Sequence, residues 1–150
     1  MPQSLDCVII HLVFSAKDRA PLITEAIEPE LHAYLASLCR SHGCNAYRVG
    51  GVQDHVHIVA SLGRTIPISQ LVEKLKKASS KWMKTKGSTF SNLYWQSGYG
   101  VFSVSSTHLD DVIRYVACQK EHHKASSFQQ EYLRILKKYG IDYDERYVWD

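Results

Sequence analysis

Two histidines of this 150-residue chain flank a single apolar residue in a segment that is predicted to be a strand. Side chains alternate between the two faces of a strand, so His55 and His57 point the same way and Val56 points the other way. Two imidazoles about 6–7 Å apart can bind one divalent cation together. Asp54 could orient an imidazole, or it could simply serve a turn. A chain with eight histidines can also contain such a pair by chance.

Tyr115 and Gln119 lie four residues apart in a segment with helical periodicity. At about 100° per residue they share a face beside the apolar stripe of that helix, not within it. The stripe consists of Leu109, Val112, Ile113 and Val116. Tyr115 is therefore predicted to be presented rather than buried, although a tyrosine at the boundary of a core fits the same pattern.

These residues together suit one reaction. Two imidazoles and the amide oxygen of Gln119 offer three ligands to a divalent cation and leave coordination positions open. A phenol with an ordinary pKa of about 10 is a poor nucleophile at neutral pH unless a cation helps it. The same cation would polarise a phosphodiester and stabilise the charge of its transition state. The set favours covalent transfer of a phosphoryl group to Tyr115.

A local excess of lysine marks residues 68–86, where six lysines accompany the single acid Glu73. The whole chain has 18 basic and 15 acidic residues and a net charge of only +3. Such an excess suits a phosphate backbone, and a solvated lysine face is the alternative. The predicted nucleic-acid contacts are Lys74, Lys77 and Lys81, together with Arg19 after the first predicted strand.

A single domain over residues 1–150 must position these side chains. The chain is 45% apolar and 22% charged and can bury a core without a disulfide or a structural metal. Apolar periodicity predicts strands over 6–16, 44–50, 55–62 and 99–106, and helices over 27–39, 68–85, 108–123 and 127–140. This order indicates an α+β, ferredoxin-like split βαβ sandwich: an antiparallel sheet with helices on one face, plus C-terminal helices.

Local signals refine these elements. A turn containing Gly50, Gly51 and Asp54 is predicted between the second and third strands. Capping boxes are predicted at the start of the last two helices, where Thr107 precedes Asp110 and Ser127 precedes Gln130. There is no apolar run that could span a membrane and no signal peptide, and four scattered cysteines indicate reduced thiols. We therefore expect a cytoplasmic protein.

The order of the motifs resembles that of the single-tyrosine HUH transposases, small enzymes of insertion sequences that move as single-stranded DNA. His55-Val56-His57 resembles the HUH motif, and Tyr115 with Gln119 resembles the tyrosine helix. The segments HLVFSAKDR, DHVH and WQSGYG agree with this pattern in the same order. The likeness covers roughly residues 6 to 140.

This resemblance implies a reaction dependent on Mg²⁺ or Mn²⁺ on single-stranded DNA with hairpins at the element ends. Carried over, His55, His57 and Gln119 are metal ligands, and Tyr115 is the nucleophile that keeps the 5′ phosphate and releases a 3′ hydroxyl. The resemblance also implies a homodimer whose active sites are shared, with Tyr115 reaching the histidines of the other subunit. His122 and His123 are assigned no role and are expected at the solvated surface.

Three alternatives remain open on the sequence. The first is a domesticated relative that processes palindromic repeats of the genome with the same chemistry. The second is a module that binds single-stranded nucleic acid without cleaving it. The third is a metal-dependent hydrolase in which water attacks instead of Tyr115.

Overall fold

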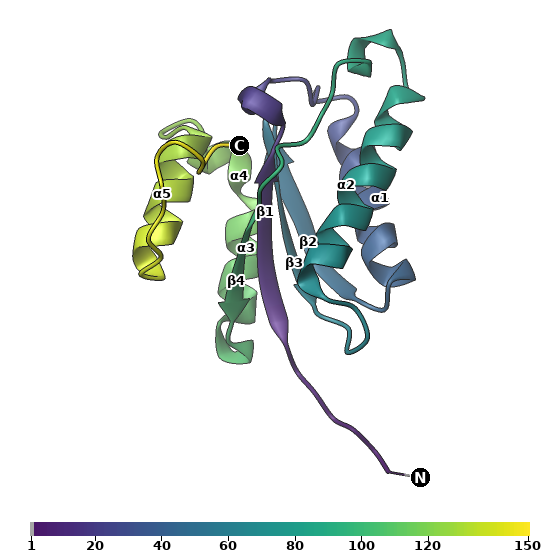
Figure 1. Cartoon of the computed structure of the whole chain (residues 1–150), viewed down its shortest axis with the longest axis vertical. Coiled ribbons are helices and arrows are strands. Elements are labelled where there is room, and N and C mark those ends of the chain that lie inside the picture. The colour runs from purple at the N-terminus through teal and green to yellow at the C-terminus, as the bar shows by residue number, and fades with distance from the viewer. Residues whose placement is uncertain (1) are drawn as a thin grey trace.

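Four strands form one antiparallel sheet in the computed structural model, which describes residues 2–150 (Figure 1). They are β1 (Ile9–Ser15), β2 (Asn45–Val52), β3 (His55–Ser61) and β4 (Gly100–Val104), and their order in the sheet is β2-β3-β1-β4. Strands β1 and β3 therefore lie in the centre, with Val13 opposite His57. This is the order of a split βαβ sandwich, so the predicted fold class is confirmed.

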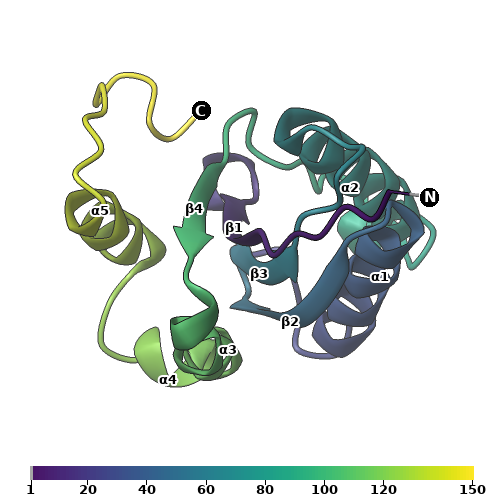
Figure 2. The same cartoon turned by 90° about the horizontal axis from the view of Figure 1, so that it is seen from below.

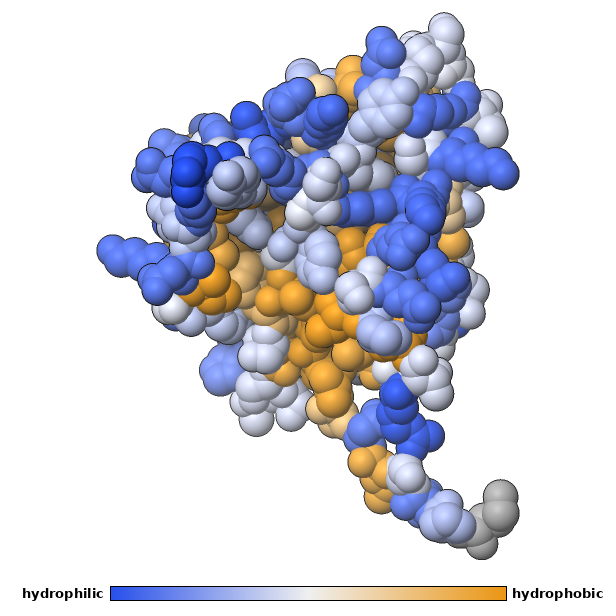
Figure 3. All heavy atoms as spheres, in the orientation of Figure 1, coloured by the Kyte–Doolittle hydropathy of each residue, from blue (hydrophilic) through white to orange (hydrophobic). Residues whose placement is uncertain are grey.

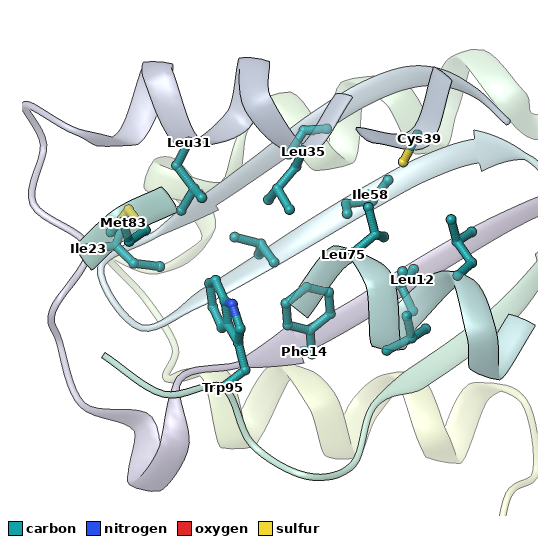
Figure 4. Packing of buried hydrophobic residues seen from close by; sticks show 14 of the residues in the cluster. Leu12, Phe14, Ile23, Leu31, Leu35, Cys39, Ile58, Leu75, Met83 and Trp95 are labelled. Carbon is teal, nitrogen blue, oxygen red and sulfur yellow. The ribbon is translucent and has the colours of Figure 1, made fainter. Parts of the chain in front are cut away.

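One face of the sheet carries the larger core. Helices α1 (Glu28–Ser41) and α2 (Ile68–Lys84) pack on this face (Figures 1 and 2). Alternation along the central strands sends every second side chain into this layer, where the Phe14 and Trp95 rings meet edge to face at 4.9 Å. The labelled core residues in Figure 4 are Leu12, Phe14, Ile23, Leu31, Leu35, Cys39, Ile58, Leu75, Met83 and Trp95.

The opposite face is covered by α3 (Leu109–Ala117), α4 (Gln119–His122) and α5 (Phe128–Lys138) (Figure 2). Helix α3 packs so closely on β2 that a Cβ atom at Gly50 would lie 2.1 Å from the carbonyl oxygen of Val116. Only glycine permits this approach. Strand β2 continues through Gly50 and Gly51, which the sequence predicted in the turn. The turn itself consists of Gln53 and Asp54.

The helix predicted over 108–123 is broken at Cys118, which separates α3 from α4 with φ −100° and ψ 25°. The carbonyl oxygen of Cys118 accepts hydrogen bonds from the amides of Glu121 and His122, each at 3.1 Å, and these bonds begin a new turn. The prediction of one continuous helix was wrong.

The two predicted capping boxes have different outcomes. Ser127 and Gln130 form the predicted box, with N···O distances of 3.0 and 3.2 Å. Thr107 and Asp110 do not form one, because Ser105 accepts the Thr107 amide instead and starts a short 3₁₀ turn. This turn, η3 (Ser106–His108), leads into α3.

The chain after α5 returns to the sheet. Val148 and Trp149 pack against a cluster that includes Phe128 and Tyr132. The backbone oxygen of Asp150 accepts a hydrogen bond from the amide of Gly98 at 2.8 Å. All four cysteines are free thiols. Among the helices of residues 2–150, none combines the length and the apolar character that a membrane crossing needs.

Candidate metal centre and nucleophile

His55 and His57 lie on the face of β3 that is covered by α3, α4 and α5. Both side chains are fully buried, and their ring centroids are 5.0 Å apart. Val56 between them points into the core on the other face. The strand thus directs two imidazoles into the space between the sheet and the C-terminal helices.

Tyr115 and Gln119 reach these histidines within the same chain. His55 Nε2 donates to Gln119 Oε1 at 3.1 Å. The ring of Tyr115 is half-buried, and its centroid is 5.8 Å from that of His57. This placement differs from the expectation that Tyr115 would meet the histidines of another subunit. Helix α3 lies over its own sheet, where Val116 packs with Ile9 and Val59 and Gly50 lets the backbones approach closely.

Glu131 of α5 is a central member of the site that the sequence analysis missed. Its Oε1 accepts from the Nε2 atoms of His57 at 2.9 Å and His123 at 3.2 Å, and lies 3.3 Å from that of His55. Its Oε2 accepts the hydroxyl proton of Tyr115. A signal was present in the sequence, because Glu131 occupies an apolar position of the helical stripe Phe128, Tyr132 and Leu136.

The histidine pair after Gln119 also belongs to this site, contrary to the expected solvated surface. His123 is almost buried and donates from Nε2 to Gln119 Oε1 at 3.0 Å. The ring of His122 packs against that of Tyr115 at 4.7 Å. His123 follows Gln119 by four residues and His122 follows Tyr115 by seven, so helical spacing already places both histidines on the face of Tyr115 and Gln119.

The donor set fits a divalent cation. Ligand atoms of His55, His57 and Glu131 all lie within 4.8 Å of one another. Imidazole nitrogens together with a carboxylate oxygen form a familiar set for divalent metals. Each imidazole is also held from behind, because Asp54 Oδ1 accepts from His55 Nδ1 at 2.7 Å and His11 Nε2 lies 2.7 Å from His57 Nδ1. Such outer contacts keep each Nε2 directed inward.

The charges of the site set its proton positions. Burial lowers the pKa of His57 to about 4, so this imidazole is neutral, as a metal ligand must be. For His55 burial acts in the same direction, but the carboxylates of Asp54 and Glu131 outweigh it and raise the pKa to about 8. Burial and the negative charge of Glu131 raise the pKa of Tyr115, so its phenol is protonated at neutral pH. A cation among the histidines would oppose this effect.

The lysines predicted to contact nucleic acid lie on the other side of the sheet. Lys74, Lys77 and Lys81 are exposed on α2, whereas Tyr115 belongs to α3, which lies on the opposite face of the sheet (Figure 2). Lys77 also pairs with Glu73, with an Nζ–Oε1 distance of 2.6 Å. The structure therefore does not bring these lysines together with the nucleophile.

Arg19 lies beyond the end of β1. Its backbone is in the left-handed region with φ 55°, next to Asp18 with φ 56°. Its guanidinium carbon stands 5.5 Å from the centroid of the Trp149 ring. Arg19 is thus held against the C-terminal segment.

Comparisons with known proteins agree with this architecture. The sequence matches the family described as "Transposase IS200 like" over residues 4–119. A structure from Deinococcus radiodurans R1, of a protein assigned as a transposase, is 20% identical with a TM-score of 0.61; the match covers 79% of this chain and 98% of that one. A REP-associated tyrosine transposase bound to a REP hairpin is 11% identical with a TM-score of 0.60, over 82% and 72% of the two chains. No curated protein matches the sequence significantly.

Proposed function

This chain belongs to the IS200-like transposase family of DNA-processing enzymes, and on that premise we propose that it cleaves and rejoins single-stranded DNA through Tyr115. The observation that carries the proposal is the meeting of Tyr115, Gln119 and the two histidines on one face of the sheet, although His55 and Gln119 are 64 positions apart. The structural neighbour bound to a REP hairpin supports a substrate in which hairpins mark the ends.

The proposed step is a transesterification. The phenol oxygen of Tyr115 forms a bond to phosphorus, the bond from phosphorus to O3′ breaks, and O3′ takes up a proton to leave a 3′ hydroxyl. The phenol proton leaves toward Glu131 Oε2, which accepts it in a hydrogen bond, and passes on to solvent, because the surrounding imidazoles outweigh burial and hold the pKa of the Glu131 carboxyl well below its usual range. Because the pKa of Tyr115 is raised, we expect this proton to move as the bond to phosphorus forms. Attack of a 3′ hydroxyl on the phosphotyrosine reverses the step and rejoins the strands.

We propose that His55, His57 and Gln119 hold Mg²⁺ or Mn²⁺, with Glu131 and His123 as further donors beside them. When bound, such an ion polarises the phosphodiester and stabilises the charge of its transition state. The chain itself fixes the two imidazoles through Asp54 and His11, and it places the phenol next to them.

The proposal is tested with a hairpin-bearing single strand, the unmodified protein and Mn²⁺. The expected product is a protein–DNA adduct that survives denaturation. Binding of the hairpin without any adduct or cleavage would favour the non-cleaving module. Cleavage that leaves a free 5′ phosphate and no adduct would favour the hydrolase.

The genomic setting separates the two remaining readings of the same chemistry. Inverted palindromes that flank the gene would mark an element-encoded transposase, and palindromic repeats dispersed through the genome would mark a domesticated relative. With four free thiols, we propose that either form works in the reducing cytoplasm.

A homodimer is the assembly that the family resemblance implies, and we propose the β4 edge as its surface. Strand β4 is an edge strand, and hydrophobic side chains gather on this side of the molecule within a hydrophilic rim (Figure 3). Unpaired strand edges and exposed apolar patches favour association. Analytical ultracentrifugation of the purified chain tests this assembly.

Mixing two inactive proteins tests where the active site is completed. Because Tyr115 and Gln119 contact histidines of their own chain, we expect no activity when His57→Ala and Tyr115→Phe subunits are mixed and allowed to exchange. Every site in such a mixture carries at least one lesion. If sites were shared between subunits, one site of each heterodimer would be intact, and adduct would appear on the His57→Ala chain. Recovery of that adduct would contradict completion within one chain.

The salt dependence of DNA binding tests the lysine face of α2. Charge reversal of Lys77 and Lys81 to Glu is expected to flatten the plot of log affinity against log salt by about 0.7 for each phosphate of a single strand that the lysines neutralise in the parent protein. Fluorescence anisotropy with a labelled hairpin measures this slope. Arg40→Glu, at the exposed end of α1, is the matched control. If the Lys77→Glu, Lys81→Glu protein has the same slope as the parent protein, these lysines are solvated surface and do not contact DNA.

A further inference from the structure

A cleft between α3 and α5 opens onto the nucleophile. It encloses about 690 Å³, and its walls include Tyr115, Glu131, His108, Arg134, Lys138 and Tyr139. We propose that this cleft binds the unpaired DNA strand next to the scissile phosphate, with Arg134 and Lys138 contacting its phosphates. This inference rests on the proposed cleavage of single-stranded DNA and adds the path that the strand takes to Tyr115.

Helix periodicity aligns the cations with the active site. Glu131, Arg134 and Lys138 are spaced by three and four residues, so they lie on one face of α5. Along the helix axis, Arg134 lies about 4.5 Å and Lys138 about 10.5 Å beyond Glu131. The wall of α5 therefore leads from the tyrosine–glutamate contact outward along a row of two positive charges.

These two cations are available for a ligand. Within residues 2–150 neither Arg134 nor Lys138 forms an ion pair with a carboxylate, and Arg134 only donates to the hydroxyl of Ser126 at 3.0 Å. Both side chains are exposed.

The acids of the cleft are already occupied. Asp111 pairs with Arg114, and Glu131 holds Tyr115 and the histidines. The charge that Arg134 and Lys138 present to a ligand in the cleft is therefore positive.

Arg134 lines the same cleft as the nucleophile. It lies one helical turn beyond Glu131, whose Oε2 accepts the hydroxyl proton of Tyr115. A phosphate held by Arg134 would thus lie close to the phenol that attacks it. The α2 lysines cannot serve this purpose, because the sheet separates them from Tyr115 (Figure 2).

An aromatic ring in the wall of the cleft indicates an unpaired strand. Tyr139 stacks on Phe102 with ring centroids 5.0 Å apart, and its hydroxyl donates to the carbonyl oxygen of Ser103 at 3.0 Å. The ring is held in place from one side, yet 40% of the residue is exposed. A fixed aromatic face with nearby cations is the usual platform for single-stranded bases. Bases within a duplex already stack on both sides and are not free to use it.

The test compares two ligands in the Tyr115→Phe background, where binding is measured without cleavage. One is a hairpin alone, and the other is the same hairpin with an unpaired extension on the side of the cleavage site. Arg134→Glu with Lys138→Glu is expected to weaken binding of the extended ligand about tenfold and to leave binding of the bare hairpin unchanged. The control is Lys137→Glu, a neighbouring residue of the same helix that does not line the cleft.

Two results would overturn the inference: an extension that adds no affinity to the parent protein, or an equally weakened binding with Lys137→Glu. Thermal melting of each variant checks that the fold is kept. We expect unchanged melting temperatures, since all three side chains are exposed. The same variants carrying Tyr115 are then assayed for adduct, which should decrease only in the Arg134 and Lys138 protein. If even the unmodified protein forms no adduct, the proposed function fails, while the binding comparison still decides the role of the cleft.

Discussion

Tyr115→Phe is expected to abolish the covalent protein–DNA adduct while leaving binding of a hairpin-bearing single strand intact. Phenylalanine keeps the ring that packs against His57 and His122 and removes only the attacking oxygen. Loss of a nucleophile with no substitute should reduce adduct formation on the order of 10⁴-fold or more. Denaturing gel electrophoresis of labelled DNA measures the adduct, and anisotropy measures binding.

The same substitution removes one hydrogen bond to Glu131, and this effect must be kept apart from the chemical one. Removing a partner of a buried carboxylate costs about 1–3 kcal/mol of stability. We expect this loss to lower the melting temperature while the variant stays folded under the conditions of the assay. Tyr132→Phe is the matched control, since Tyr132 is a buried tyrosine of α5 that packs on the Trp149 side. It should form adduct like the parent. Adduct formed by Tyr115→Phe at the parent level would refute the assignment.

The second large effect concerns the metal. His57→Ala, or removal of divalent ions by a chelator, is expected to reduce adduct formation by on the order of 10³-fold or more, because no divalent ion then polarises the phosphodiester or stabilises the charge of its transition state. The chelator changes no residue, so its effect cannot come from a damaged fold. Adding Mn²⁺ back should restore the reaction in the parent protein and not in His57→Ala.

Binding of the ion has a readout that does not depend on catalysis. Mn²⁺ should raise the melting temperature of the unmodified protein, because a ligand that binds only the folded state stabilises it. The increase should be lost in His57→Ala and kept in His32→Ala, whose histidine lies on α1 across the sheet. A reaction that proceeds unchanged in chelator, with no change in melting temperature, would show that the site needs no metal.

The sequence predicted those parts of the site that rest on local periodicity. Alternation along β3 places His55 and His57 together, and helical spacing places Gln119 one turn from Tyr115. Both relations depend only on neighbouring residues, so they survive in the folded chain. The predicted fold class is confirmed for the same reason, since the order of strands and helices restricts the sheet to few topologies.

The missed parts depend on contacts between distant segments. Glu131 reaches His57 from 74 positions away, and only its place in an apolar stripe suggested that it is buried. Helical spacing places His123 on the face of Gln119, but its contacts with His55 and Glu131 come from other segments. The predicted strand ends at Gly50, two residues before β2 does, because the close contact of Gly50 with α3 is tertiary. The sequence also could not show that the α2 lysines and Tyr115 lie on opposite faces of the sheet.

Identification of the amino acid that carries the DNA tests the central claim most directly. A hairpin-bearing strand labelled differently at its two ends is incubated with the unmodified protein and Mn²⁺, the adduct is digested with a protease, and the linked peptide is sequenced by mass spectrometry. We predict that the peptide containing Tyr115 carries the downstream piece through its 5′ phosphate, and that the upstream piece ends in a free 3′ hydroxyl. DNA attached to any other residue, or cleavage that leaves Tyr115 unmodified throughout the reaction, would contradict the account.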